Sequence, residues 1–445
     1  MVKISIIMPL FNAETYLEET LHSILAQTLQ EFEIICINDA STDDTTDILH
    51  RFQKLDNRIR IINNTKRLGA AVSRNLGMHE AKGIYFAFLD GDDIFDKEML
   101  ELSYHEIVKH DADVVMFEYI HVSSEWIYEK KTVQRSRLFA EKYCREPFSI
   151  QDLDPIEFMN WSSSPCNKLF KKTFLVSKKL EFQTLSSAND TYFVTMALLL
   201  ASKLIMLNDR RVMLYARDHN VSTRISYDRD PMCIYWAMKR LGDELIQRGL
   251  FDRFFQYFYC ITFYNLRNAI LKTKKSEGAK QFYEFLRKEG IDNFVRLSKE
   301  CFQKTDIYIQ KGMEKYKTLE FDSGWYRDEE ILKLYLCKNG KRLLSFFQLC
   351  KSNNQQVIVW GVGKNGRILL DFLKTHNIWF VEVVDKDEKK QGTRINGYMI
   401  MKPDACLKRE EVILATSLAI FSEVARASNG KDCKVIEIGE ILEMP

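Results

Sequence analysis

The stretch Ile84-Tyr-Phe-Ala-Phe-Leu-Asp-Gly-Asp-Asp93 decides how the rest of the chain is interpreted. Its six apolar or aromatic residues in a row are too few for a helix and predict a buried strand. Asp90, Asp92 and Asp93 follow around Gly91 at the carboxyl end of that strand, where open α/β sheets bind their ligands. Carboxylate oxygens suit hard cations such as Mg²⁺ and Mn²⁺, which are often shared with substrate phosphates. The stretch therefore predicts a metal site that holds a nucleotide diphosphate, and the alternative is a solvated acidic turn.

The first hundred residues alternate between strand and helix patterns. Strands are predicted at Ile4–Leu10, Phe32–Ile37 and Arg58–Ile62, and helices at Thr15–Gln27, after Asp43 with Ser41 or Thr42 as the N-cap, and at Gly69–Ala81. Strands separated by helical patterns indicate a parallel sheet with right-handed crossovers. Polar residues gather where the strands end, namely Asn12, Asp39, Asp90 and Asp92. Three loops are therefore expected to converge on one pocket.

Composition limits the class of protein. The 445 residues suggest several domains, and 46% hydrophobic with 28% charged residues is an ordinary globular composition. A net charge of +2 gives no electrostatic case for nucleic-acid binding. The ten cysteines come no closer than Cys337 and Cys350, so no CxxC pair exists, and we expect reduced thiols in a cytoplasm. No apolar run reaches the roughly 18 residues of a membrane span, and the longest, Phe193–Ala201, is expected in a core.

Four segments occur in order and at short spacing: Met8-Pro-Leu-Phe-Asn12, Ile37-Asn-Asp-Ala-Ser-Thr-Asp43, Gly69-Ala-Ala-Val-Ser-Arg-Asn75 and Phe88-Leu-Asp-Gly-Asp-Asp93. Together they resemble the family 2 glycosyltransferases, inverting enzymes with the GT-A fold, over roughly residues 1–225. The resemblance implies a nucleotide-sugar donor, usually a UDP-sugar, and a Mn²⁺ or Mg²⁺ ion.

The same resemblance assigns roles to residues of all four segments. It places Pro9, Phe11 and Asn12 at the nucleoside, Asp39 at the base, Arg74 at the nucleotide, and Asp90, Gly91 and Asp92 at the ribose and the metal-bound diphosphate. Asp92 is the predicted metal ligand. Asn38 departs from the family pattern, since many members carry a second aspartate there, and this leaves the base and sugar preference open.

Inverting transfer also needs a base that takes the proton of the acceptor hydroxyl. Ser187-Ala-Asn189-Asp190 precedes an apolar helical run, where resembling enzymes keep an acidic motif, so Asp190 is the predicted base. The alternative is that Asp190 or Asn189 only caps the helix. Asn167-Lys168 resembles a segment that flanks the acceptor cleft. Tyr215-Ala-Arg-Asp-His-Asn-Val-Ser222 resembles a closing segment whose basic side chains meet the diphosphate, with an exposed polar loop as the alternative.

From about Asp228 the pattern changes to amphipathic helices. They are predicted at Cys233–Ile246, Phe251–Leu271, Ala279–Lys288 and Glu329–Cys350, the last with a break at Asn339-Gly340. The segment 251–264 is strongly aromatic. An aromatic core between helices is favoured, and the alternative is a membrane-surface patch helped by Lys272, Lys274 and Lys275.

After the polar linker 351–356, Val357–Trp360 predicts a strand that runs into Gly361-Val-Gly-Lys-Asn-Gly366, and the next strand, Trp379–Val384, leads to Asp385. This spacing is typical of a dinucleotide-binding turn with its ribose-binding acid. Too few residues remain for more than one nucleotide-binding half, and no residues for hydride transfer accompany it. We therefore expect a small non-catalytic Rossmann-like module, with NAD binding as the less favoured alternative.

These patterns together predict an α/β protein with a GT-A domain over 1–225, built on a mixed, mostly parallel sheet, an α-helical region over 226–350 and a Rossmann-like domain over 353–445. The expected function is transfer of a sugar to a glycan, lipid-linked or protein acceptor, as in bacterial surface polysaccharide or glycoprotein assembly. The expected location is the cytoplasm, and peripheral attachment to the inner face of the plasma membrane and homo-oligomers are left open. Two alternatives are a non-catalytic nucleotide-sugar-binding scaffold with a nucleotide-sensing tail, and a bifunctional enzyme.

Overall fold

The computed structural model describes residues 1–117, 119–122, 134–135, 146–155, 158, 163–207, 214–217, 230–272, 277–305, 309–310, 313–314, 343–353, 355–402, 412–415 and 434–437. The chain forms two compact units, Met1–Thr305 and Asp306–Pro445. Each unit is described by itself below. The three-domain division expected from the sequence stays a prediction.

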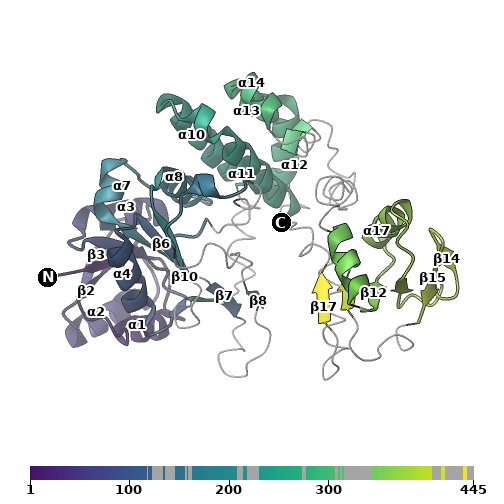
Figure 1. The fold of residues 1–445 in the computed structure, drawn as a ribbon. Coiled ribbons are helices and arrows are strands. Elements are labelled where there is room, and N and C mark those ends of the chain that lie inside the picture. Colours follow the sequence, from purple (N-terminus) through teal and green to yellow (C-terminus); the bar gives the residue numbers. More distant parts are fainter. Residues whose placement is uncertain are drawn as a thin grey trace. The chain divides into compact units, whose positions relative to one another are not determined.

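A seven-stranded sheet forms the centre of the first unit (Figure 1). Its strands are β1 (Ile4–Leu10), β2 (Phe32–Asn38), β3 (Ile59–Asn63), β4 (Tyr85–Phe88), β6 (Val114–Phe117), β9 (Lys168–Lys171) and β10 (Leu204–Leu207), in the order β10-β6-β9-β4-β1-β2-β3. All neighbours are parallel except β9, which runs antiparallel to both β4 and β6. The predicted mixed, mostly parallel sheet is confirmed.

Helices cover both faces of this sheet (Figure 1). Alternate residues of β1, from Ile4 to Leu10, share one core cluster with α1 (Leu17–Leu25), α2 (Thr45–Leu55) and α4 (Met99–His110). On the other face α3 (Ala70–Glu80) lies so close that a Cβ at Gly77 would stand 2.5 Å from Ile7 Cγ2. A small second sheet has the order β5-β11-β7-β8, with β5 (Ile94–Phe95), β7 (Tyr119–Val122), β8 (Gln134–Arg135) and β11 (Leu214–Arg217).

The predicted cap of α2 is wrong. The N-cap position belongs to Asp44, and the helix begins at Thr45, whose N–H donates to Asp43 Oδ1 at 3.1 Å. Ser41 is used elsewhere, because its Oγ accepts from the N–H of Asn12 at 3.1 Å. The Ser41 hydroxyl therefore connects the loop after β2 to the loop after β1, and the carboxylate of Asp43 binds the N–H at the start of the helix.

Four phenylalanine rings form an aromatic cluster beneath the carboxyl end of β4. Phe88 ends β4, Phe170 lies on β9, Phe182 precedes α8 (Thr191–Leu200), and Phe193 lies on α8. The Phe182 and Phe193 rings stack with centroids 3.9 Å apart, and Phe88 contacts each of the other three at 4.9–5.6 Å. Such pairs add directional attraction to their burial. The cluster therefore fixes α8 to the end of β4.

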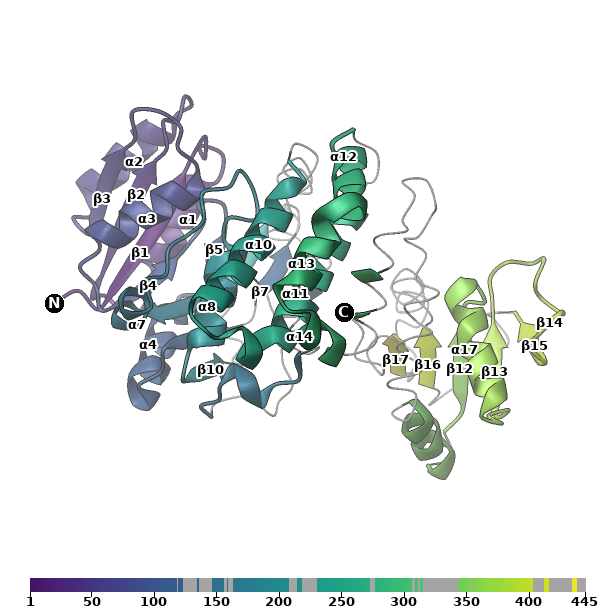
Figure 2. The ribbon, with the colours of Figure 1, turned by 90° about the horizontal axis from the view of Figure 1, so that it is seen from above.

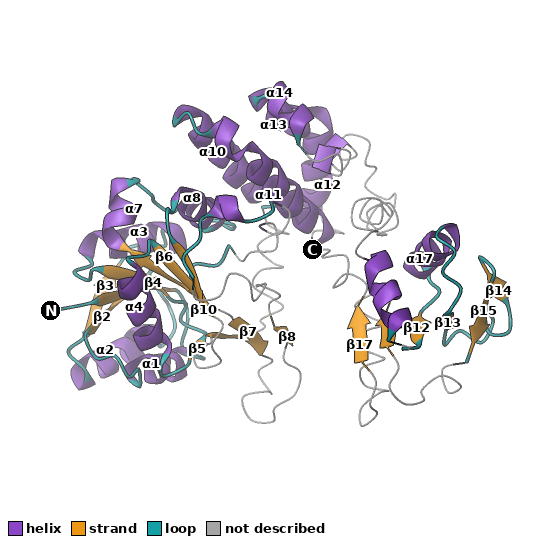
Figure 3. Ribbon diagram, viewed as in Figure 1, coloured by secondary structure: helices purple, strands orange, loops and turns teal. Residues whose placement is uncertain are grey.

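Helices α10 (Met232–Gln247) and α11 (Phe251–Lys272) lie side by side, followed by α12 (Glu277–Phe285), a π-helical turn (Leu286–Gly290), α13 (Ile291–Leu297) and α14 (Lys299–Lys304) (Figures 2 and 3). Short elements also occur at Ile150–Asp152 and α7 (Lys172–Ser177). Most aromatic side chains of α11 are buried, which confirms the core interpretation of this segment; they are Phe251, Phe254, Tyr257, Phe258, Tyr259 and Phe263. Lys274 and Lys275 lie outside the described residues. Among the described helices, none is long and apolar enough to cross a bilayer.

The second unit contains another sheet, of order β14-β15-β13-β12-β16-β17. The strands are β12 (Val357–Trp360), β13 (Val381–Val384), β14 (Arg394–Ile395), β15 (Tyr398–Met401), β16 (Val412–Ala415) and β17 (Lys434–Glu437), and all pairs are parallel except β14 with β15. Helix α17 (Lys364–Thr375) and a helical segment at 343–352 pack on its core. The predicted strand at 379–384 starts two residues late, because Trp379 is half exposed and stacks on Tyr398. Asn339 and Gly340 lie outside the described residues.

Candidate active site

The carboxyl ends of β1, β2 and β4 meet at one edge of the first sheet. Leu10 pairs with Asn38, and Ile7 pairs with Phe88, so the segments after all three strands begin at neighbouring points. The N–H of Asp39 donates to Leu10 O at 2.8 Å, and that of Leu89 donates to Ile7 O at 3.1 Å. The structure thus brings together the loops that carry the predicted nucleotide contacts.

The loop after β1 is tied to the loop after β2. Asn12 adopts a left-handed backbone with φ 50°, and its Oδ1 accepts from the N–H of Thr42 at 2.9 Å. Phe11 is exposed beside it, with the Arg67 guanidinium 3.9 Å above the ring. Pro9 pairs with Ile37 inside the sheet. The edge therefore presents an exposed aromatic ring with a cation on it, a surface suited to a planar base.

Asp39 is buried and holds the start of α3. Its Oδ1 accepts from Asn64 Nδ2 at 2.7 Å and from the N–H of Leu68 at 2.8 Å, while Oδ2 accepts from the N–H of Gly69 at 2.7 Å. A carboxylate offers about four acceptor positions, so these bonds leave one on Oδ2. Contact with the base stays a prediction, and loop organisation is a role that the sequence did not indicate.

Asn38, the departure from the family pattern, is enclosed in the same loop network. Its Nδ2 donates to Thr46 Oγ1 at 2.9 Å and to Asn63 Oδ1 at 3.0 Å, and its Oδ1 accepts from the N–H of Ser41 at 3.1 Å. An amide can donate and accept hydrogen bonds at once, whereas an ionised carboxylate can only accept them. The hydrogen bonds of the loop therefore account for asparagine instead of aspartate at position 38.

The acidic turn after β4 is held by a buried threonine and a glycine. Thr20 Oγ1 on α1 donates to the carbonyl oxygens of Gly91 at 3.1 Å and Asp93 at 2.8 Å. A Cβ at Gly91 would lie 2.3 Å from Leu10 Cδ2, so any larger residue there would have to displace the Leu10 side chain. The carboxylates are therefore mounted on a firmly placed backbone.

Arg74 connects this turn to the segment of the predicted base. Its Nη2 donates to Asp90 Oδ1 at 2.7 Å, and its Nη1 donates to Asn189 Oδ1 at 3.1 Å. The guanidinium is buried and lies 5.3 Å from the centre of the Phe182 ring. Its Nε is buried and has no hydrogen-bond partner within the described part of the chain. A buried donor without a partner costs stability, so Arg74 Nε–H has a hydrogen bond to offer.

Asp190 occupies the N-cap position of α8 but makes no capping hydrogen bond with its side chain. Burial raises the pKa of its carboxyl above the ordinary value, while Arg74 and Lys168 nearby oppose the rise. The capping alternative therefore lacks its hydrogen bond, and Asn189 is engaged with Arg74 instead. A carboxylate with a raised pKa is a better proton acceptor than an ordinary one, as a general base requires.

Lys168 is a buried cation at the start of β9. Its Nζ donates to Ser164 O at 2.7 Å and to Asn167 Oδ1 at 2.8 Å, and Asn167 Nδ2 in turn donates to Phe117 O at 2.8 Å. Burial lowers the pKa of Lys168 to about 7. The Asn-Lys segment predicted to flank the acceptor cleft is thus fixed to β6, and Lys168 lies close enough to Asp190 to feel its charge.

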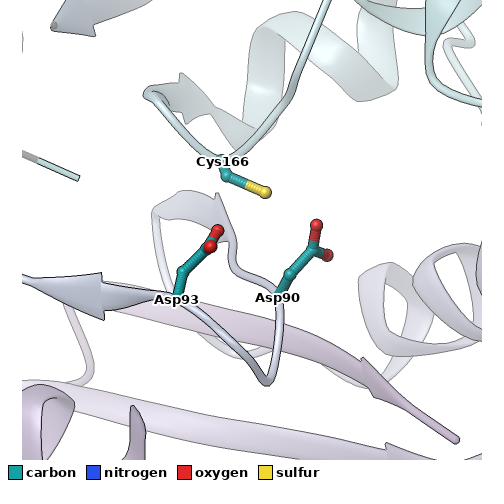
Figure 4. Close-up of side chains that lie close together, drawn as sticks. All are labelled: Asp90, Asp93 and Cys166. Atoms are coloured by element: carbon teal, nitrogen blue, oxygen red, sulfur yellow. The ribbon is translucent and has the colours of Figure 1, made fainter. Parts of the chain in front are cut away.

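Three metal-ligating side chains meet at the acidic turn (Figure 4). One ligand atom from each of Asp90, Asp93 and Cys166 lies within 4.8 Å of the others, and the three side chains point toward one another. Asp92, the predicted metal ligand, is half-buried on the same turn and is not a member of this group. Two carboxylates beside a thiol are a donor set that fits a divalent cation.

Residues 5–163 match the model of glycosyl transferase family 2. The chain is 31% identical over 234 residues to the glycosyltransferase GlyG of Streptococcus pneumoniae serotype 4, a match that covers 51% of this chain and 74% of GlyG. The chain belongs to glycosyltransferase family 2. The enzyme is also 24% identical over 370 residues to the poly(ribitol-phosphate) beta-glucosyltransferase of Bacillus spizizenii, covering 77% of this chain and 53% of that relative.

A solved structure shows the same fold. TarS 1–349 of S. aureus in complex with UDP-GlcNAc superposes with a TM-score of 0.59 at 22% identity, over 73% of this glycosyltransferase and 92% of that chain. The GT-A fold predicted from the four motifs is therefore confirmed. Residues 353–429 match a second family model, described as C2185-like, N-terminal.

Some predicted contacts of the glycosyltransferase cannot be placed. His219 and Ser222 of the closing segment lie outside the described residues, and Tyr215 and Arg217 are described only as backbone of β11. In the second unit, the buried Asp385 accepts from the N–H of Val362 at 2.6 Å, from that of Asp387 at 2.9 Å and from Lys390 Nζ at 3.1 Å. Its carboxylate is thus engaged with its own glycine turn.

The sequence did not single out Cys166 or Thr20, and it gave Asp93 no separate role. A signal for Cys166 exists in the pairing of β9 with β4, where Ala87 lies opposite Leu169. If this register is continued for three residues past that pair, beyond the ends of both strands, residue 166 comes opposite residue 90. The antiparallel register was needed to see this.

Proposed function

We propose that this glycosyltransferase is a metal-dependent, inverting enzyme that moves a sugar from a UDP-sugar to a hydroxyl of a glycan, lipid-linked or protein-linked acceptor. The observation that carries the proposal is the buried contact of Arg74 with both Asp90 and Asn189. This one side chain joins the turn that faces the diphosphate to the residue preceding the base. This contact supports donor binding and proton removal at neighbouring positions.

The chain's own groups have distinct parts in this reaction. Arg74 offers its buried Nε–H to a diphosphate oxygen, because that donor has no partner among the described residues. Asp190 takes the proton of the acceptor hydroxyl as the hydroxyl oxygen attacks the anomeric carbon. Burial favours this transfer, since it raises the pKa of the Asp190 carboxyl. The aromatic cluster keeps the helix of Asp190 at a fixed distance from the acidic turn.

A divalent cation fits the acidic turn. Asp90 and Asp93 supply oxygens there, and Asp92 is the ligand predicted from the sequence. When bound, the cation would stabilise the negative charge of the departing diphosphate. Mn²⁺ and Mg²⁺ are the candidates that the family resemblance implies.

The relatives support the donor and acceptor classes. The TarS structure with UDP-GlcNAc supports a UDP-sugar donor for this chain, since the fold is shared. The poly(ribitol-phosphate) relative by its name glycosylates a phosphate-linked polymer, which supports a surface polymer as the acceptor class here. The location at the cytoplasmic face and the module over 353–445 stay predictions.

The test is a panel of nucleotide sugars with Mn²⁺, following release of nucleoside diphosphate, for the wild type, Asp92→Asn and the control Asp47→Asn, an exposed carboxylate on α2. We expect turnover with a UDP-sugar, its loss in excess chelator and in Asp92→Asn, and normal turnover in the control. All three proteins should unfold at nearly the same temperature, since each variant replaces a carboxylate that is not fully buried by an amide of the same shape. Full activity of Asp92→Asn would contradict its assignment as a ligand, and full activity in chelator would contradict metal dependence.

A further inference from the structure

We propose that the sulfur of Cys166 is a direct ligand of the active-site cation, together with Asp90 and Asp93, and that it makes the site favour cations that accept sulfur over Mg²⁺, with Co²⁺ and Zn²⁺ favoured most and the harder Mn²⁺ less. The inference rests on the proposed function, because it names the ligands and the cation class of that same site.

The first support is position. Cys166 precedes β9 by two residues and Asp90 follows β4 by two residues, so the β4–β9 register, continued past the ends of both strands, brings the two positions opposite each other. The backbone near it is fixed, since the N–H of Cys166 donates to Ser164 Oγ at 3.2 Å and Asn167 O accepts from the N–H of Phe117 at 3.1 Å. The sulfur is therefore held near the turn by the fixed segment that leads into β9.

The second support is the arrangement of the ligand atoms. The two oxygens and the sulfur lie within 4.8 Å of one another. Ligands of one cation, at about 2.1 Å for oxygen and 2.3 Å for sulfur, stand at most about 4.4 Å apart when they are opposite each other and closer otherwise, so the three side chains would draw together on the cation. Cys166 is 1% exposed and Asp93 8%, whereas the Asp90 side chain is 41% exposed. Two of the three ligands are thus buried in the protein, and a bound cation would keep coordination positions free on its solvent side for the donor.

The third support comes from Arg74, which points to an oxyanion beside this group. Its Nη2 already binds Asp90, and its buried Nε has no hydrogen-bond partner in the described chain. A diphosphate oxygen shared by the cation and Nε–H would satisfy both. This observation is independent of the three ligand atoms and indicates that the space beside them takes a ligand.

The sulfur determines the choice of cation. Mg²⁺ takes oxygen ligands and keeps water in preference to sulfur, whereas Mn²⁺, Co²⁺ and Zn²⁺ accept thiolate more readily in that order. A thiol that faces two carboxylates in a buried place is also poorly suited to be only a small apolar side chain, the usual state of a buried cysteine.

The experiment measures cation binding without turnover. Co²⁺ is titrated into the full-length protein, and the near-ultraviolet absorption of thiolate-to-cobalt charge transfer is followed for the wild type, Cys166→Ser, Cys166→Ala and Cys301→Ser. Cys301 is the matched control, since it is buried and donates from Sγ to Asp252 Oδ1 at 3.3 Å, outside the active site. Calorimetric titrations with Mn²⁺ and Mg²⁺ give the two affinities for each protein.

We expect the absorption in the wild type and Cys301→Ser and its loss in both Cys166 variants. Removing the sulfur should weaken Mn²⁺ binding by about tenfold or more, since even outer partners of metal ligands are worth that much, and should change Mg²⁺ binding less. Cys166→Ala keeps the site apolar if serine disturbs the fold. Cation binding that shows no charge transfer and is unchanged in the Cys166 variants would overturn this inference alone. Sugar transfer in excess chelator would overturn metal dependence itself.

Discussion

Replacement of Asp190 by asparagine should abolish transfer while sparing both donor binding and stability. Removing a general base costs about 10²- to 10⁴-fold in rate, which corresponds to about 3–5 kcal/mol of transition-state stabilisation. The amide has the shape of the carboxylate but cannot take the proton. We therefore expect the turnover at saturating donor and acceptor to fall by this factor.

The contacts around Asp190 explain why binding should survive. Arg74, which we place at the diphosphate, binds Asn189 and Asp90, so Asp190→Asn leaves both of its hydrogen bonds intact. Asn189→Ala is the matched comparison, because it removes one of these bonds from the neighbouring position. That variant should raise the donor KM more than it lowers the turnover at saturation.

Stability follows from the direction of the pKa shift. Burial raises the pKa of Asp190, so the folded state holds its proton more tightly than the unfolded chain. The cost of ionising it in the fold appears as pH rises from the ordinary pKa of an aspartate through the raised value, and it is fully present only above that raised value. Asp190→Asn removes this cost, and its Tm at pH 7 should equal or exceed that of the wild type.

The assay is steady-state kinetics with a donor titration by calorimetry and a thermal melt. Wild-type turnover should rise with pH through the raised pKa of Asp190, and the residual turnover of Asp190→Asn should lose this dependence. Retained turnover with a collapsed donor affinity would show that Asp190 binds the donor and that the base lies elsewhere. A large drop in Tm would refute the stability argument.

Three further outcomes are expected. Burial alone would raise the pKa of Glu33, but hydrogen bonds from Ser5, the Lys82 N–H and Arg60 outweigh it and lower the pKa. Glu33→Gln should lower the free energy of unfolding in urea at pH 7 by about 3 kcal/mol. The difference in unfolding free energy from the wild type should narrow as pH falls through that lowered pKa. Gly91→Ala brings its Cβ against Leu10, so we expect a loss of about 1–3 kcal/mol in the same assay and a higher donor KM; an unchanged KM would show that the turn is not held by this contact. Calorimetry of the full chain with NAD should show no binding tighter than about 0.1 mM, roughly 5.5 kcal/mol, because Asp385 already serves its own turn; micromolar binding lost in Asp385→Ala would make the second unit a nucleotide site.

Local patterns predicted the fold of the first hundred residues well. The strand Ile4–Leu10 matches its predicted bounds, and the segment 84–93 forms a strand followed by the acidic turn, because apolar runs and turn residues report burial directly. The cap of α2 failed, since its hydroxyls bond across to the β1 loop, which no local rule contains. Cys166 was missed because it joins Asp90 only through an antiparallel pairing between distant segments. Arg74 was predicted by motif, but its contact with Asn189, 115 residues away, came from the fold.

The aromatic cluster has a consequence for how this enzyme could diversify. Phe88 leads directly into the acidic turn, and Phe182 and Phe193 lie on either side of the segment that carries Asp190. The distance between the acidic turn and the segment of Asp190 is thus set by side chains packed in the interior and not by the surface loops. Substitutions in the loops can therefore change the acceptor preference without changing the spacing between the acidic turn and Asp190. A smaller residue in place of Phe193 would alter that spacing and lower the rate of transfer, although Phe193 touches no substrate.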